Sequence, residues 1–122
     1  MSTKEEIKNA VAAHGRWKTK LKNAIDTGKI DAGIPIIKAD NQCAFGKWLH
    51  GPSITERQKQ ADHYREVKKL HAAFHEKAAK VAQLAVSGNK TAAVRMMEVN
   101  GEFSVASADL TTAMLTWLKK AT

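Results

Sequence analysis

The chain has 122 residues, of which 43% are hydrophobic and 26% are charged, a balance that is normal for a globular protein and a length that fits a single domain over residues 1–122. No apolar run approaches the roughly 20 residues of a membrane-spanning helix, and the N-terminal stretch lacks the apolar core of a signal peptide. The single cysteine excludes an internal disulfide and suits a reducing compartment, so we expect a cytoplasmic protein.

The formal net charge of +8 is of the kind that attracts nucleic acid, anionic lipid or an acidic protein surface. The lysines, however, follow several helix faces, and no dense basic run is interleaved with aromatic residues. A solvated basic surface is therefore the favoured interpretation, and a nucleic-acid partner is disfavoured.

The first predicted helix begins near Ser2, because Ser2 and Glu5 have the spacing of a capping box. It ends at Gly28, since glycine is a common helix stop. Its inner positions recur every three or four residues and include a histidine: Ile7, Val11, His14, Leu21 and Ile25. This periodicity predicts an amphipathic helix with a histidine on its apolar face.

The next stretch, residues 29–40, is expected to be a connector without a regular helix, since it contains Gly33 and Pro35. Asp40 is then positioned to cap a short helix over residues 41–50. The Gly-Pro pair that follows ends this helix. The short helix therefore carries the only cysteine of the chain.

The third predicted helix begins after Ser53 and Glu56, which repeat the capping-box spacing, and it ends near Ser87 and Gly88. The residues of its inner face include two histidines: Tyr64, Val67, His71, Phe74, His75, Ala78, Ala82 and Ala85. The last predicted helix covers residues 89–120. Together these elements predict an all-α fold, an antiparallel four-helix bundle with an extra short helix that carries the cysteine.

The last predicted helix carries two apolar stripes, whereas one is enough for a helix of a monomeric bundle. One stripe holds Val94, Met97, Val105, Ala108 and Leu115. The other stripe supplies the candidate dimer interface: Met96, Val99, Phe103, Leu110, Met114 and Trp117. A second stripe indicates either a buried central helix or a dimer. We favour a homodimer, because four helices rarely bury one of them on all sides.

Four residues of this pattern have side chains that can hold a zinc ion: His14, Cys43, His71 and His75. His71 and His75 lie one helical turn apart, so both imidazoles project from the same face. We expect His14 to join them from an antiparallel first helix. Cys43 lies near a helix N-terminus, which favours the thiolate, and it completes a tetrahedron. The sequence therefore predicts one Zn²⁺ site.

Residues beside these candidate ligands have supporting roles. Gly46 lets the short helix approach the bundle, Phe45 and Trp48 anchor that helix in the core, and Trp17 borders the stripe of the first helix. Each candidate ligand taken singly has a plainer interpretation, because a lone histidine is usually a hydrogen-bonded core residue and a lone cysteine a small hydrophobic one. Burial of three unpaired imidazoles would be costly, and this favours the zinc site.

Three motifs in order carry a resemblance to a known family: HGRW at residues 14–17, CAFGKW at residues 43–48 and HAAFH at residues 71–75, separated by 25 and 22 residues. With them the chain resembles the chemoreceptor zinc-binding domain from about residue 7 to residue 118. The resemblance implies a helical bundle that tends to dimerise and that holds zinc through three histidines and one cysteine. His50 and His63 fall outside these motifs and are expected at the surface.

The resemblance also implies a function. Members of this family regulate bacterial signalling in response to zinc, either in chemoreceptors or in diguanylate cyclases that control cyclic-di-GMP. Some members respond to hypochlorous acid through the zinc-bound cysteine, which would make Cys43 the redox-sensitive residue. The expected partner is a protein of one of these pathways, and the chain is expected to be either a stand-alone member or an excised N-terminal domain.

We expect no enzymatic activity, because Cys43 occupies the fourth zinc position that a catalytic site keeps open for water. Glu76, the nearest candidate base, is expected to point away from the ligand face. Two alternatives stay open. One is a structural zinc site in a dimeric interaction module, which would unfold without metal. The other is a basic nucleic-acid-binding bundle with incidental histidines, whose binding would depend steeply on salt.

Overall fold

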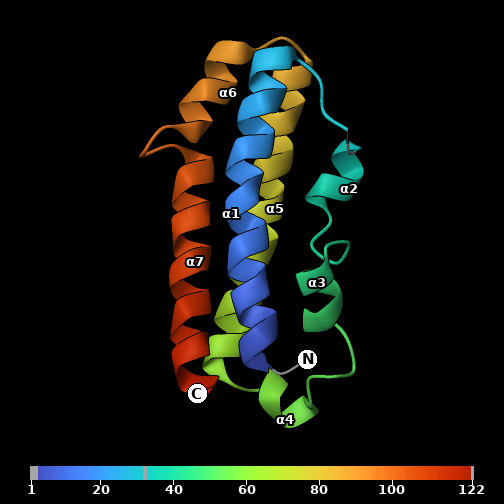
Figure 1. Cartoon of the computed structure of the whole chain (residues 1–122), viewed down its shortest axis with the longest axis vertical. Coiled ribbons are helices and arrows are strands. Elements are labelled where there is room, and N and C mark those ends of the chain that lie inside the picture. Colours follow the sequence, from blue (N-terminus) through green and yellow to red (C-terminus); the bar gives the residue numbers. More distant parts are fainter. Residues whose placement is uncertain (1–2, 32, 122) are drawn as a thin grey trace.

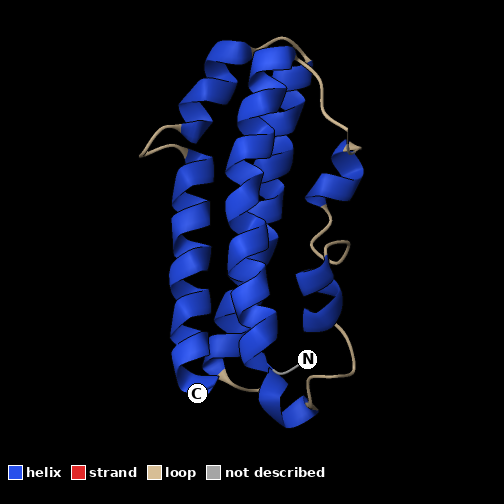
Figure 2. Ribbon diagram, in the orientation of Figure 1, coloured by secondary structure: helices blue, strands red, loops and turns tan. Residues whose placement is uncertain are grey.

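The computed structural model describes residues 3–31 and 33–121, and all regular secondary structure in these residues is helical (Figure 2). The predicted all-α bundle is confirmed. In chain order the helices are α1 (Thr3–Thr27), α2 (Ile34–Lys38), α3 (Ala44–Leu49), α4 (Glu56–Lys59), α5 (Asp62–Val86), α6 (Lys90–Met97) and α7 (Glu102–Ala121).

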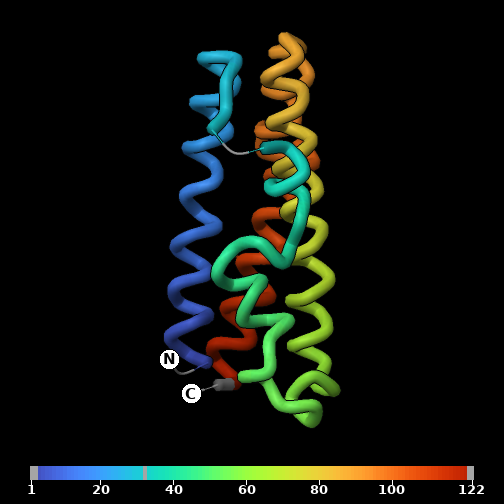
Figure 3. Tube along the Cα trace, turned by 90° about the vertical axis from the view of Figure 1, so that its right-hand side faces the viewer, coloured from blue at the N-terminus to red at the C-terminus, as the bar shows by residue number. Residues whose placement is uncertain are grey.

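Three rows of helix form the body of the bundle: α1, α5, and α6 followed by α7 (Figure 1). The chain between α1 and α5 forms a fourth row, which descends along the bundle through α2 and α3 (Figure 3). In this row α2 packs against α5, and α3 packs against α1. Because this segment returns the chain to its starting end, α1 and α5 run in the same direction. The expectation that α1 is antiparallel to the helix of the histidine pair is therefore wrong.

The two longest helices, α1 and α5, end where the sequence predicted. Helix α1 stops before Gly28, which has a φ of 73°, and α5 stops before Gly88, which has a φ of 83°. Residues other than glycine rarely adopt this left-handed conformation, so glycine is favoured at these ends. The predicted cap at Ser2 lies outside the described residues.

The segment between α1 and α5 contains more helix than predicted. Residues Ile34–Lys38 form α2 although they were expected in a connector. Pro35 lies in the first turn of α2, where its missing N–H removes no helical hydrogen bond. Helix α3 begins only at Ala44, and its N-cap is Cys43 rather than Asp40. The cysteine therefore lies just outside the helix that was expected to contain it.

The capping box also lies later than Ser53 and Glu56. Thr55 Oγ1 accepts the backbone N–H of Gln58 at 3.1 Å, and Gln58 Oε1 accepts the backbone N–H of Thr55 at 2.9 Å. This box begins the four-residue helix α4, and α5 begins separately at Asp62.

The last predicted helix is broken into α6 and α7. Glu98 is extended, with φ −67° and ψ 164°, and a Cβ at Gly101 would lie 2.6 Å from the carbonyl carbon of Met96. Ser104 Oγ donates a hydrogen bond of 2.8 Å to the carbonyl oxygen of Met97 across the turn. The backbone at residues 98–101 thus folds too tightly for a continuous helix, which the apolar periodicity alone did not reveal.

The candidate dimer stripe belongs to the core of the single chain. Helices α6 and α7 both pack against α1 and α5, and five of the six residues are buried: Met96, Phe103, Leu110, Met114 and Trp117. The sixth, Val99, lies in the turn before α7 and is 89% exposed. The five buried residues are therefore not available as the predicted interface, whereas Val99 is exposed. The other stripe faces outward, with Val94, Val105 and Leu115 exposed.

Candidate metal centre

The four predicted ligands come together from three elements. His14 lies in the middle of α1, His71 and His75 lie one turn apart on α5, and Cys43 lies at the N-terminus of α3. The three histidines are buried, and Cys43 is partly buried. Residues from three distant parts of the chain therefore share one site.

The backbone around Cys43 directs its sulfur toward His71 and His75 of α5. Cys43 is extended, with φ −79° and ψ 161°, and its Sγ accepts the backbone N–H of Gly46 at 3.3 Å. Gly46 packs against the backbone of residues 40 and 41. This close approach needs a residue without a side chain, as the sequence predicted for Gly46.

Four of the separations between donor atoms lie close to those of a tetrahedral zinc site. Cys43 Sγ is 3.4 Å from His71 Nε2 and 3.5 Å from His75 Nε2. His71 Nε2 is 3.1 Å from both His14 Nε2 and His75 Nε2, and all four ligand atoms lie within 4.8 Å of one another. Zinc bonds of about 2.1 Å to nitrogen and about 2.3 Å to sulfur give tetrahedral edges of roughly 3.3–3.6 Å. The cluster fits this ion with little movement.

Backbone carbonyls fix the tautomers of two of the rings. His14 Nδ1 donates to the carbonyl oxygen of Ala10 at 2.8 Å, and His75 Nδ1 donates to that of Ile37 at 2.9 Å. In a neutral ring the Nε2 atom then carries a lone pair. Both lone pairs point toward Nε2 of His71, which can donate a proton to only one of them. A cation among these atoms would satisfy all three rings.

His71 is the ring that protein contacts satisfy least. Its side chain is fully buried, and its Nδ1 has no hydrogen-bond partner within the described residues. A buried polar atom without a partner destabilises a fold. Coordination of Nε2 would place the ring proton on Nδ1, which would stay without a partner, so the support for a metal comes from the converging Nε2 atoms instead.

Burial sets the protonation of the four groups. It lowers the pKa of His14 to about 4 and that of His71 to about 2, and it also lowers the pKa of His75. The rings are therefore neutral at pH 7, as metal ligands must be. Burial raises the pKa of the Cys43 thiol, and the N–H of Gly46 opposes this rise less strongly. The helix N-terminus was predicted to favour the thiolate, but burial has the larger effect on the Cys43 pKa and favours the neutral thiol. The thiolate form of Cys43 would therefore need a bound metal ion to stabilise it.

Aromatic side chains enclose the cluster. Phe45 is buried, and its ring centroid lies 5.9 Å from that of His14 and 5.2 Å from that of His71. Trp48 stacks on Phe45 at 5.7 Å, and Trp17 meets the edge of His75 at 6.5 Å. The residues predicted to support the site therefore lie around it.

Other contacts at the site were not predicted. Phe74, interpreted from the sequence only as a core residue, lies 5.0 Å from the ring of His14. The carbonyl groups of Ala10 and Ile37 carry no side-chain signal that a sequence could reveal. His50 and His63 stay outside the cluster: His50 pairs with Asp40 at 3.3 Å, and the ring of His63 stacks on Trp117 at 5.5 Å.

The environment of the cluster bears on its chemistry. The four donors converge on one position and enclose it from several sides. Glu76, one residue after the predicted ligand His75, is exposed to solvent.

None of the helices in the described residues is long and apolar enough to cross a membrane.

Residues 14–82, more than half of the chain, match the family model described as the chemoreceptor zinc-binding domain. The matched stretch contains all four residues of the cluster. No curated protein and no solved structure matches the chain.

Proposed function

The chain belongs to the chemoreceptor zinc-binding domain family, and from this premise we propose that it is a cytoplasmic regulatory domain of bacterial signalling whose signal is zinc occupancy or the oxidation state of Cys43. The family is a zinc-binding sensory family and not a known catalytic one. The chain accordingly takes Zn²⁺ as its cofactor, and we propose that it is not an enzyme.

We propose that His14, Cys43, His71 and His75 are the zinc ligands. One observation carries this assignment: four donor atoms lie within 4.8 Å of one another while backbone carbonyls hold two of the rings with Nε2 free to coordinate. The ion supplies positive charge that satisfies the lone pairs and the thiolate. The protein holds the rings neutral by burying the three histidines, and it leaves Cys43 partly exposed.

The signalling step rests on Cys43, the ligand on the shortest element. Cys43 caps helix α3, which has only six residues and packs against α1. Cys43 is also partly exposed. Hypochlorous acid can therefore reach its sulfur. A two-electron oxidation transfers oxygen to Sγ and releases chloride, and the resulting sulfenic acid is a poorer ligand. The segment around Cys43 is then free to move, which alters the surface that a signalling partner reads.

We also propose that the chain forms a homodimer, and that its partner belongs to a chemoreceptor or diguanylate cyclase pathway. The support for self-association is the outward stripe of α6 and α7, where Val94, Val105 and Leu115 are 41%, 46% and 49% exposed. Apolar side chains in a row on one face are typical of an interaction surface. This face replaces the buried stripe that the sequence suggested.

The first test is the metal content of the purified protein, measured by mass spectrometry beside a His71→Ala/His75→Ala variant. We expect about one zinc per chain, lost in the variant. A Cys43→Ala variant should keep its helical content and lose affinity for zinc in competition with a chelator. Absence of metal after zinc is supplied, or unchanged affinity without Cys43, would contradict the assignment.

The alternative function is a structural zinc site in an interaction module. The three buried rings favour it, because without metal the Nε2 of His71 can donate a proton to only one of the two Nε2 atoms that face it. Circular dichroism after chelation separates the two functions: a sensor keeps its helices and changes shape, whereas a structural site loses its helices. A basic nucleic-acid-binding bundle would instead show affinity for DNA or RNA that falls steeply with salt.

A further inference from the structure

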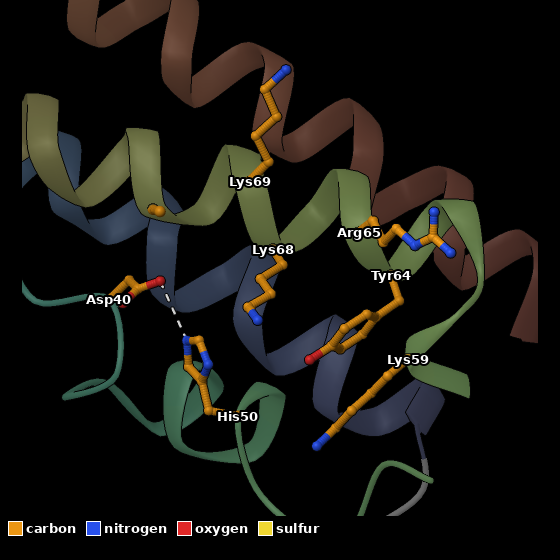
Figure 4. A pocket seen from close by; sticks show the side chains of 8 residues that line it. Asp40, His50, Lys59, Tyr64, Arg65, Lys68 and Lys69 are labelled. Carbon is orange, nitrogen blue, oxygen red and sulfur yellow. Dashed lines mark hydrogen bonds and ion pairs between the residues drawn. The ribbon is translucent and has the colours of Figure 1, made fainter. Parts of the chain in front are cut away.

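A basic cleft lies on the side of the bundle beside the metal cluster, at the seam between the segment that carries Cys43 and helix α5. Its volume is about 490 Å³, within the range of small-molecule sites. One wall consists of Asp40 and His50, which flank Cys43 in the sequence, and the opposite wall consists of side chains from α4 and α5 (Figure 4).

The charge of the cleft is strongly unbalanced. Lys59, Arg65, Lys68 and Lys69 line it, against a single carboxylate, Asp40. That carboxylate already pairs with His50 at 3.3 Å. Neither Lys68 nor Lys69 makes an ion pair within the described residues. Lys59 pairs with Glu56 at 3.9 Å, so the positive charge that the protein leaves unpaired within the cleft is that of Lys68.

The side chains differ in how far they reach into the cleft. Lys68 extends from α5 toward His50, and the hydroxyl of Tyr64 points into the same space (Figure 4). Tyr64 is buried and donates to the carbonyl oxygen of Leu49 at 2.8 Å, so its ring forms a fixed floor. Arg65 and Lys69 point away from the cleft (Figure 4), and Arg65 donates to the carbonyl oxygen of Gln60 at 2.9 Å. Lys68 is thus the amino group best placed for a ligand.

We propose that this cleft binds the phosphate group of a small phosphorylated ligand. Lysine ammonium groups bind phosphate as point charges, and a concave surface of one sign concentrates the field that attracts it. Asp40 would accept a hydrogen bond from a hydroxyl or amino group elsewhere on the ligand. A phosphate ester of a nucleoside or polyol therefore fits better than free phosphate.

Occupancy of the cleft would be coupled to the metal cluster. Asp40 and His50 belong to the segment of Cys43, and Lys68 lies less than one turn before His71 on α5. A ligand that touches both walls holds them together and slows the departure of Cys43 from the cluster. This coupling, unlike the binding itself, rests on the proposed function.

The binding test is an NMR titration of the zinc-loaded protein with AMP, inorganic phosphate and adenosine. We expect saturable shifts in residues 40–50 and 64–72 with AMP, weaker binding of inorganic phosphate and none of adenosine. Lys68→Gln should weaken AMP binding at least about fivefold. Lys22→Gln, which removes the same charge from an exposed position on α1, should change it by less than about twofold.

Several results would overturn the proposal. Equal weakening by Lys68→Gln and Lys22→Gln would mean general attraction to a cationic protein, and absence of saturation at millimolar AMP would mean no site. Equal affinity for AMP and inorganic phosphate would remove the role given to Asp40. For the coupling, AMP should slow zinc transfer to a chelator at least about twofold in the wild type and not in Lys68→Gln. Zinc content is measured before AMP is added, and a protein that binds no zinc contradicts the proposed function. A protein that binds zinc but shows no effect of AMP contradicts only the proposal about the cleft.

Discussion

The substitution Gly46→Ala tests whether the close approach of two backbone segments positions Cys43, the proposed metal ligand. A Cβ at Gly46 would overlap the carbonyl oxygen of Asp40, and it would lie 2.8 Å from the carbonyl carbon of Asp40 and 3.1 Å from the Cα of Asn41. These are backbone atoms, which cannot rotate away as a flexible side chain can. The loop that leads to Cys43 would therefore have to move.

The magnitude follows from two opposing effects. Alanine is favoured over glycine inside a helix by about 1 kcal/mol, whereas overpacking against rigid atoms costs about 1–3 kcal/mol. We expect Gly46→Ala to lower the free energy of unfolding by roughly 0–2 kcal/mol. The larger effect falls on the site, because Cys43 Sγ lies only 3.4 and 3.5 Å from two histidine nitrogens. Displaced supporting residues typically lower metal affinity about 10- to 100-fold, and we expect this loss.

The assay is zinc competition with a chelator, together with urea unfolding of the zinc-free protein. Gly15→Ala is the matched control, because it also lies within a helix and a Cβ there meets no atom within 4 Å. The control should gain about 1 kcal/mol of stability and keep its zinc affinity. If Gly46→Ala bound zinc as tightly as the wild type and gained as much stability as Gly15→Ala, the reasoning from the close approach would be refuted.

Three further predictions concern pH, one hydrogen bond and assembly. In the zinc-free protein the free energy of unfolding should fall as the pH falls from 6.5 toward 4, because burial lowers the pKa of His14 from 6.5 to about 4 and the unfolded chain binds the proton first. Urea unfolding at pH 7 and pH 5 measures this, and His14→Gln should reduce the difference. Tyr64→Phe removes the 2.8 Å bond to the carbonyl oxygen of Leu49 and should cost about 1–3 kcal/mol in the same assay, and an unchanged midpoint would argue against it. Val105→Glu/Leu115→Glu places charge on the exposed stripe and should convert a dimer into a monomer in analytical ultracentrifugation without loss of thermal stability, whereas a persistent dimer would place the interface elsewhere.

The sequence by itself was sufficient for the features that depend on neighbours along the chain. Helical periodicity predicted α1 and α5, and the glycines at 28 and 88 predicted where these helices end. The candidate ligands were also visible in the sequence, because the i, i+4 spacing of His71 and His75 projects both rings from one helix face. These features need only the local geometry of a helix.

The pattern of apolar residues did not predict which face of the last predicted helix would be buried, because two faces of that helix are apolar. The last predicted helix has two apolar stripes, and its pattern does not distinguish which of them α1 and α5 would cover. The structure buries the stripe of Phe103 and Leu110 and exposes that of Val105 and Leu115. The break at residues 98–101 was likewise hidden, since the periodicity continues across it.

Only the tertiary structure decided how the four side chains of the candidate metal centre are held. The direction of α1 relative to α5 depends on the path of the segment between them, and the tautomer of His75 depends on the carbonyl oxygen of Ile37, which lies 38 residues away in the chain. Cys43 became a helix cap because Gly46 can touch the backbone at residue 40. The sequence was therefore sufficient to identify the proposed ligands. Their geometry and protonation depend on through-space contacts between segments that only folding brings together.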